Sequence, residues 1–134
     1  NVLDTLTAYE NIALALTIKG ENTSEIDSKI KEVAKYLEIE KVLDKYPYQM
    51  SGGQKQRVAS ARAIVTEPSL ILADEPTGNL DRKNGEEIID LLKLSNRNLN
   101  QTILLITHDE KVALEADRII TIEDGKIISD QKGR

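Results

Sequence analysis

Residues 70–75, Leu70-Ile71-Leu72-Ala73-Asp74-Glu75, are four apolar residues that run directly into two carboxylates. An apolar run without polar alternation is typical of a strand buried on both faces in a parallel sheet. In such sheets, ligands bind beyond the carboxyl ends of the strands. Adjacent carboxylates are costly to hold there without a cation or a catalytic task, so Asp74 and Glu75 are candidate metal-binding and catalytic residues. The alternative is a structural role, in which they cap the strand end or pair with lysines.

The segments after this strand alternate between helix and strand patterns. We expect a helix over 84–94, a strand over 102–107, a helix over 110–116 and a strand over 118–122. Asp124-Gly125 then predicts a hairpin turn, because this dipeptide readily adopts the positive φ angles that a tight turn needs. The order predicts an α/β sheet with flanking helices.

The first half of the chain has a helical pattern instead, up to a break near Pro68. Thr7 followed by Glu10 predicts a capped helix that ends at Gly20. Ser24 predicts the cap of a second helix with one apolar face. A third helix is expected after Gly53, running to about residue 65.

The third helix is preceded by Ser51-Gly52-Gly53-Gln54. Glycines allow close approach of a ligand to the backbone, and a helix N-terminus offers free N–H groups and a partial positive charge. This combination suits a phosphate. A helix cap with a glycine turn explains the same four residues, and both interpretations remain open at this point.

The only histidine, His108, follows the second predicted strand in Ile106-Thr107-His108-Asp109. A lone histidine is more often structural than catalytic. Its position favours a functional role, because it lies at the same predicted sheet edge as Glu75, where a donor can reach a transferring phosphoryl group.

Composition excludes several classes of protein. A length of 134 residues fits one domain, and the net charge of -5 argues against a nucleic-acid-binding surface. There is no cysteine and no run near the roughly 18 apolar residues of a membrane span. If a membrane matters, another polypeptide is expected to cross it. The chain begins at Asn1 and its only methionine is Met50, which predicts a piece excised from a longer protein.

Three motifs occur together, in one order, over nearly the whole chain. The run from Met50 to Arg57, the run from Leu70 to Thr77, and His108 resemble the signature motif, the Walker B motif and the switch histidine of ABC ATPases. Asn79-Leu80-Asp81 resembles the D-loop of that family. Met50 stands where the family usually has leucine, a volume-conserving exchange.

The resemblance implies an incomplete P-loop NTPase fold of the ABC ATPase type. Residues 1–67 would form the helical subdomain with the signature motif, followed by part of a mainly parallel sheet with flanking helices. Residues 68–134 would be that second part, the C-terminal portion of the RecA-like core.

The resemblance also implies a role for each site residue, with ATP and Mg²⁺ as cofactors. Asp74 would hold Mg²⁺ through water, Glu75 would orient the attacking water as the base, and His108 would contact the γ-phosphate. Residues 51–54 would close over an ATP held by a second ATP-binding subunit. Asp81 would lie at the seam of that dimer.

One family motif is missing, because no G-x-x-x-x-G-K-[ST] run (Walker A) occurs in the chain. We therefore expect no ATPase activity from these residues alone. In the family, the strand before that loop lies between the strands at 102–107 and 118–122. Its absence leaves unpaired edges, so we expect either a rearranged sheet or strand exchange between copies in a swapped dimer.

Residues 73–81, with Tyr46-Pro47 before the signature, resemble the subgroup that serves lipoprotein release, macrolide and antimicrobial-peptide export, and cell division. This implies a cytoplasmic subunit, peripheral on the inner face of the cell membrane, that powers export of a peptide, drug or lipoprotein-type cargo. Residues 7–43 would dock onto an integral-membrane permease subunit, and no nucleic acid is expected as a partner. The alternatives are a non-transport ABC-type ATPase of DNA repair or chromosome maintenance, and a non-enzymatic permease-docking module.

Overall fold

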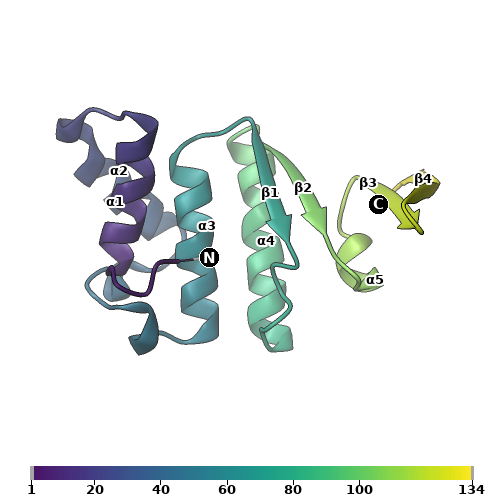
Figure 1. Ribbon diagram of the computed structural model, residues 1–134, viewed down its shortest axis with the longest axis horizontal. Helices are drawn as coiled ribbons and strands as arrows, with labels where there is room; N and C mark the ends of the chain where they lie inside the picture. The colour runs from purple at the N-terminus through teal and green to yellow at the C-terminus, as the bar shows by residue number, and fades with distance from the viewer. Residues whose placement is uncertain (1, 134) are drawn as a thin grey trace.

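The structure is a computed structural model that describes residues 2–133 (Figure 1). Its helices and strands follow the predicted order, helical first and alternating afterwards. The helices are α1 Ala8–Lys19, α2 Thr23–Tyr36, α3 Gly52–Val65, α4 Arg82–Asn98 and α5 Glu110–Ala113, with one-turn 3-10 helices η1 Glu40–Val42 and η2 Pro47–Gln49. The strands are β1 Leu70–Asp74, β2 Thr102–Ile106, β3 Arg118–Glu123 and β4 Lys126–Lys132. Among the described residues, none of the helices combines the length and apolar character that a membrane crossing requires.

The helix ends agree with the sequence signals in most places. Thr7 and Glu10 form the predicted capping box of α1, and Gly20 ends the helix with a φ of 91°. The predicted cap of α2 is wrong by two residues, because Asn22 accepts the Ser24 N–H at 3.3 Å and the helix therefore begins at Thr23. The third helix begins at Gly52, two residues earlier than expected, because Ser51 is its cap.

One apolar core joins α1, α2 and α3, which lie together at one end of the molecule (Figure 1). Its largest fully buried side chains come from the three helices and from the residues directly after α2: Ile12, Leu16, Ile30, Leu37, Ile39 and Val58. Asn11 is also buried, and its Nδ2 donates to the carbonyls of Leu3, Leu6 and Thr7. The buried amide thereby fixes the segment that enters α1.

The strands form two separate sheets. β1 and β2 are parallel, in register from Leu70 opposite Thr102 to Asp74 opposite Ile106. β3 and β4 are an antiparallel hairpin whose turn has positive φ at Asp124 (51°) and Gly125 (76°), as predicted. Figure 1 shows β1 in front of α4, with the hairpin at the far end of the molecule from α1.

Only one face of the β1–β2 sheet is covered. Helix α4 packs on that face through Ile88, Ile89 and Leu92. On the other face Leu70 and Leu72 are 57% and 62% exposed, and Leu104 and Ile106 of β2 are exposed as well. The prediction that residues 70–73 are buried on both faces is therefore wrong within the described residues, because no second layer covers the outer face.

The expected gap in the sheet is present in the single chain. β2 pairs with β1 and β3 pairs with β4, and no ladder joins β2 to β3 within residues 2–133. The predicted rearranged sheet is wrong for this chain, since the strands keep their order and leave the edges unpaired. Strand exchange needs a second chain and stays a prediction.

Two isoleucines of α1 provide a matched test of the helical core. Ile12 is 0% exposed and Ile18 is 77% exposed. We expect Ile12→Ala to lower the free energy of unfolding by about 2–5 kcal/mol, because it opens a cavity in the core. Ile18→Ala should change it by less than about 0.5 kcal/mol. Urea unfolding followed by circular dichroism measures both, and equal losses would contradict this account of the core.

Candidate functional site

Glu75 lies directly beyond the end of β1, where the backbone leaves the sheet. Its φ of 47° is left-handed, a conformation that few residues other than glycine adopt. Two backbone hydrogen bonds hold it there: Glu75 N–H donates to the Ile106 carbonyl at 2.8 Å, and Gly78 N–H donates to the Glu75 carbonyl at 3.1 Å. Such a conformation persists only where the surroundings enforce it, which is common at functional sites.

The Glu75 carboxylate meets His108 at this edge. Glu75 Oε1 accepts the backbone N–H of His108 at 3.0 Å and lies 3.4 Å from His108 Nε2. The imidazole is 97% exposed, while the Glu75 side chain is partly buried. The prediction that both residues share one sheet edge is therefore confirmed, and the exposed imidazole is free to meet a ligand.

Asp74 is the last residue of β1 and is exposed. Both carboxylates, Asp74 and Glu75, line a groove of about 850 Å³ that lies between α3 and β1. Helix α3 lines its other side through Gln56, Ala59 and Ser60. The groove places both acidic groups on one wall of a space that is large enough for a phosphate-bearing ligand.

The acidic groups fit a magnesium ion that is shared with a ligand. Within residues 2–133, no three acidic, histidine or cysteine side chains gather closely enough to form a metal site by themselves. Mg²⁺ in phosphate-binding sites usually takes only one or two carboxylates, with water and substrate phosphates supplying the other ligands. Asp74 meets that need, and Glu75 lies next to it.

Ser51, Gly52, Gly53 and Gln54 form the start of α3. Ser51 Oγ accepts the Gln54 N–H at 3.1 Å, and Gln54 Oε1 accepts the Ser51 N–H at 2.9 Å. The structural interpretation of these residues as a helix cap is therefore correct. It does not exclude a ligand, because the N–H groups of Gly52 and Gly53 belong to the first turn and have no acceptor within the helix.

The cap of α4 lies close to that of α3. Asp81 Oδ1 accepts the Asn84 N–H at 2.8 Å and begins α4. A methyl carbon at Gly52 would lie 3.5 Å from Leu80 Cδ2, an ordinary contact distance. The structure thus brings residues 51–54 beside residues 79–81, and it brings Glu75 together with His108.

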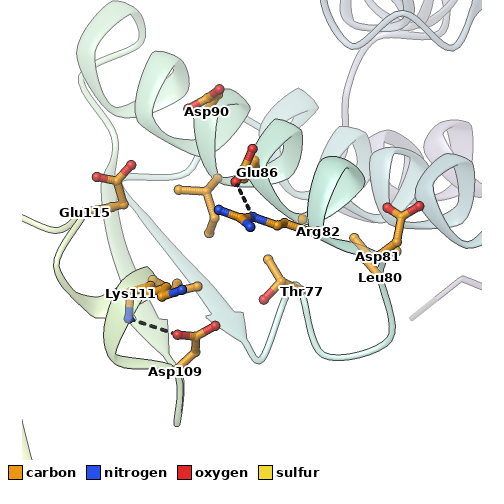
Figure 2. A pocket seen from close by; sticks show the side chains of 12 residues that line it. Thr77, Leu80, Asp81, Arg82, Glu86, Asp90, Asp109, Lys111 and Glu115 are labelled. Carbon is orange, nitrogen blue, oxygen red and sulfur yellow. Dashed lines mark hydrogen bonds and ion pairs between the residues drawn. The ribbon is translucent and has the colours of Figure 1, made fainter.

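A second groove, of about 540 Å³, lies on the other side of the Thr77–Asp81 loop, between α4 and α5 (Figure 2). Its charged groups are of both signs, with Arg82 bound to Glu86 at 3.3 Å and Asp109 capping α5 by accepting the Lys111 N–H at 2.9 Å. Asp74, Glu75 and His108 do not line it. Of the predicted site residues only Asp81 does.

Sequence reasoning missed Arg57, which lies between α3 and α4. Its side chain is 12% exposed, and its guanidinium donates to Glu87 Oε2 at 2.6 Å and to the Leu37 carbonyl at 3.1 Å. The sequence shows a short basic run here, but nothing in it pairs residue 57 with residue 87. Only the packing of the two helices reveals the contact.

Comparison with known proteins gives a consistent result. Residues 1–78 match the protein family described as ABC transporter. A putative ABC transporter ATP-binding protein of Mycoplasma genitalium is 50% identical over 131 residues, which are 98% of this chain and 42% of that protein. A bacitracin export ATP-binding protein of Halalkalibacterium halodurans is 48% identical over 127 residues, which are 95% of this chain and 50% of that protein.

Solved structures agree with the sequence relatives. An ATP-binding cassette solved as a dimer, in a post-hydrolysis state bound to ADP and Pi, is 41% identical with a TM-score of 0.86. That match covers 100% of this chain and 60% of the other. The chain thus spans half or less of the length of these two sequence relatives, and three fifths of that solved cassette.

The cap of α4 can be tested separately from any ligand. We expect Asp81→Ala to lower the free energy of unfolding by about 0.5–2 kcal/mol, because the Asn84 N–H loses its acceptor. Asp81→Asn should retain most of that stability, since its amide oxygen can accept the same bond. Chemical denaturation of the 134-residue chain distinguishes the two, and an equal loss in both variants would show that the cap is not the cause.

Proposed function

This chain belongs to the ABC transporter family, and on that premise we propose that it is part of an ATP-binding subunit that hydrolyses ATP to power export. The observation that carries the proposal is the Glu75 carboxylate, held at the end of β1 with His108 against it and Asp74 on the same groove wall. Catalysis of phosphoryl transfer depends mainly on such positioning and on charge stabilisation.

Each residue at this edge has a task in the proposed reaction. Glu75 orients the attacking water and accepts a proton from it. The backbone N–H of His108 donates to the Glu75 carboxylate and holds it in place. The exposed His108 imidazole donates to the γ-phosphate oxygens. Asp74 would hold Mg²⁺ through water, and the ion would supply charge neutralisation at the phosphates.

Residues 51–54 serve a different nucleotide in this proposal. Ser51, Gly52, Gly53 and Gln54 close over an ATP held by a second ATP-binding subunit, with the unpaired N–H groups of the α3 N-terminus facing its phosphates. Asp81 lies at the seam between the two subunits. The dimeric solved cassette supports this arrangement by similarity, and so does the nearness of residues 51–54 to residues 79–81.

The remaining assignments concern domains, place and partners. We assign residues 1–67 to a helical subdomain and 68–134 to the C-terminal part of a RecA-like core. The buried side chains of the larger apolar cluster lie mostly on α1–α3, while Ile71, Leu91 and Ile103 of the second part also pack in or against it. Residues 7–43 dock onto an integral-membrane permease, at the cytoplasmic face of the cell membrane. A peptide or drug is the cargo class favoured by similarity to the bacitracin exporter.

The base is tested by Glu75→Gln in the complete polypeptide that carries these residues, assembled with its permease. We expect ATP turnover to fall on the order of 100-fold or more, because the amide cannot take the proton, while ATP binding is retained. Phosphate release measures ATP turnover, and equilibrium dialysis measures ATP binding. Glu123→Gln, an exposed change on β3, is the matched control. Turnover that survives Glu75→Gln would exclude Glu75 as the base.

The 134 residues alone should not turn over ATP, because they contain no G-x-x-x-x-G-K-[ST] run to hold the phosphates. Phosphate release by the purified chain should equal that of the buffer at any ATP concentration. Release that rises with ATP and disappears in Glu75→Gln would show instead that this chain completes a nucleotide site without that loop.

A further inference from the structure

The N-termini of α3 and α4 approach each other unusually closely at Gly53, which is buried. A methyl carbon built at Gly53 would lie 2.7 Å from Asn84 Oδ1, a distance that real Cβ atoms essentially never show, and 3.0 Å from Asn84 Cγ, which is tighter than most real contacts. The Asn84 side chain would have to shift to admit it. At Gly52 the nearest atom is Leu80 Cδ2, at an acceptable 3.5 Å. Of the two glycines, only Gly53 therefore faces a side chain of its own chain that must move to admit a methyl group.

Asn84 links this contact to the rest of the site. Its side chain lies against Gly53, and its backbone N–H donates to Asp81 Oδ1 at 2.8 Å. The loop that leads back from Asp81 to Glu75 is held by two further bonds, from Leu80 N–H to the Thr77 carbonyl and from Gly78 N–H to the Glu75 carbonyl, each 3.1 Å. A continuous set of short contacts thus runs from Gly53 to Glu75.

One turn further along both helices, a second contact keeps them in register. Arg57 lies four residues after Gly53 and Glu87 three after Asn84, and the two side chains are joined at 2.6 Å. Arg57 is nearly buried and also bonds the Leu37 carbonyl, so its guanidinium has little freedom. The pair joins α3 to α4 one turn beyond the place where Asn84 lies against Gly53.

We propose that Asn84 is a positioning residue: residue 53 is glycine because Asn84 occupies the space of a side chain, and this contact sets where Ser51–Gln54 lies relative to Glu75. The consequence for ATP turnover rests on the function proposed above, in which residues 51–54 face a second subunit's nucleotide. The packing of Asn84 against Gly53 does not depend on that proposed function.

A set of variants of the complete polypeptide, with its permease, tests this. Gly53→Ala should lower Tm by about 4 °C or more and turnover about tenfold or more, because Asn84 must move. Adding Asn84→Ala should restore Tm to within about 1 °C and kcat/KM to within about threefold of the Asn84→Ala single variant, since only Asn84 Cβ then remains, at 3.5 Å. Asn84→Asp, which keeps the shape, should not rescue Gly53→Ala.

The single variant Asn84→Ala separates a positioning role from a purely structural one, because only a positioning role predicts a change in the ATP dependence of the rate. It keeps the backbone N–H that Asp81 accepts, so the α4 cap and Tm should change little. The ATP concentration for half-maximal rate should rise about threefold or more, because residues 51–54 lose their fixed position, while kcat changes less. Gly52→Ala is the matched glycine control. Adding Asn84→Ala to Gly52→Ala should not restore the turnover that Gly52→Ala loses, because the atoms nearest to Gly52 belong to Leu80 and Asn79 and not to Asn84.

Three results would overturn the proposal. Failure of Asn84→Ala to restore the Tm of Gly53→Ala would show that the close approach is not what requires glycine. A double variant with restored Tm but without restored turnover would show that glycine at residue 53 is required only for contact with the nucleotide. Equal rescue by Asn84→Asp would exclude side-chain volume as the cause. If turnover survives Glu75→Gln and the proposed ATPase function is wrong, the Tm comparisons still test whether Asn84 packs against residue 53. The failure of one proposal can therefore be distinguished from the failure of the other.

Discussion

Two hydrogen bonds between the ends of β1 and β2 hold together the part of the molecule on which its proposed chemistry depends. Glu75 N–H donates to the Ile106 carbonyl, and His108 N–H donates to the Glu75 carboxylate. Because the strands are parallel neighbours in register, they end at one edge. The left-handed backbone at Glu75 then turns the chain out of the sheet and leaves the carboxylate at that edge. The α4 cap and the surface that meets α3 follow within a few residues, so their positions depend on the same turn.

Much of this arrangement could be predicted from the sequence because its causes are local. Apolar runs predict β1 and β2, the Thr7 and Glu10 pair predicts a helix start, and the two strand ends predict that Glu75 and His108 lie at one sheet edge. Errors arose where distant residues decide the outcome. The exposure of Leu72 depends on a missing layer, and the role of Gly53 depends on Asn84, 31 positions away and on another helix. No local pattern contains the Arg57–Glu87 pair.

Capping and binding are compatible roles for the same residues in the proposed function. Ser51 and Gln54 each accept the other's backbone N–H, and Asp81 Oδ1 accepts the backbone N–H of Asn84. These bonds fix the start of each helix, and a fixed helix start presents its remaining N–H groups in one geometry. A ligand that binds there meets donors already in place, which reduces the entropy lost on binding. The helix cap at Ser51–Gln54 would therefore keep the proposed ligand site in a fixed geometry.

The helical core also has a consequence for the order in which the chain folds during synthesis. Nearly all of its buried side chains lie between Ala8 and Val65, with Ile71 as the only later member of the described cluster. The helices α1, α2 and α3 can therefore bury their apolar faces once the ribosome has released residue 65. β1 must wait for α4 and β2, because its partner strand begins at Thr102. Within the described residues, a nascent chain stalled between these points carries a helical unit that can already fold, joined to a β1 segment that still lacks β2.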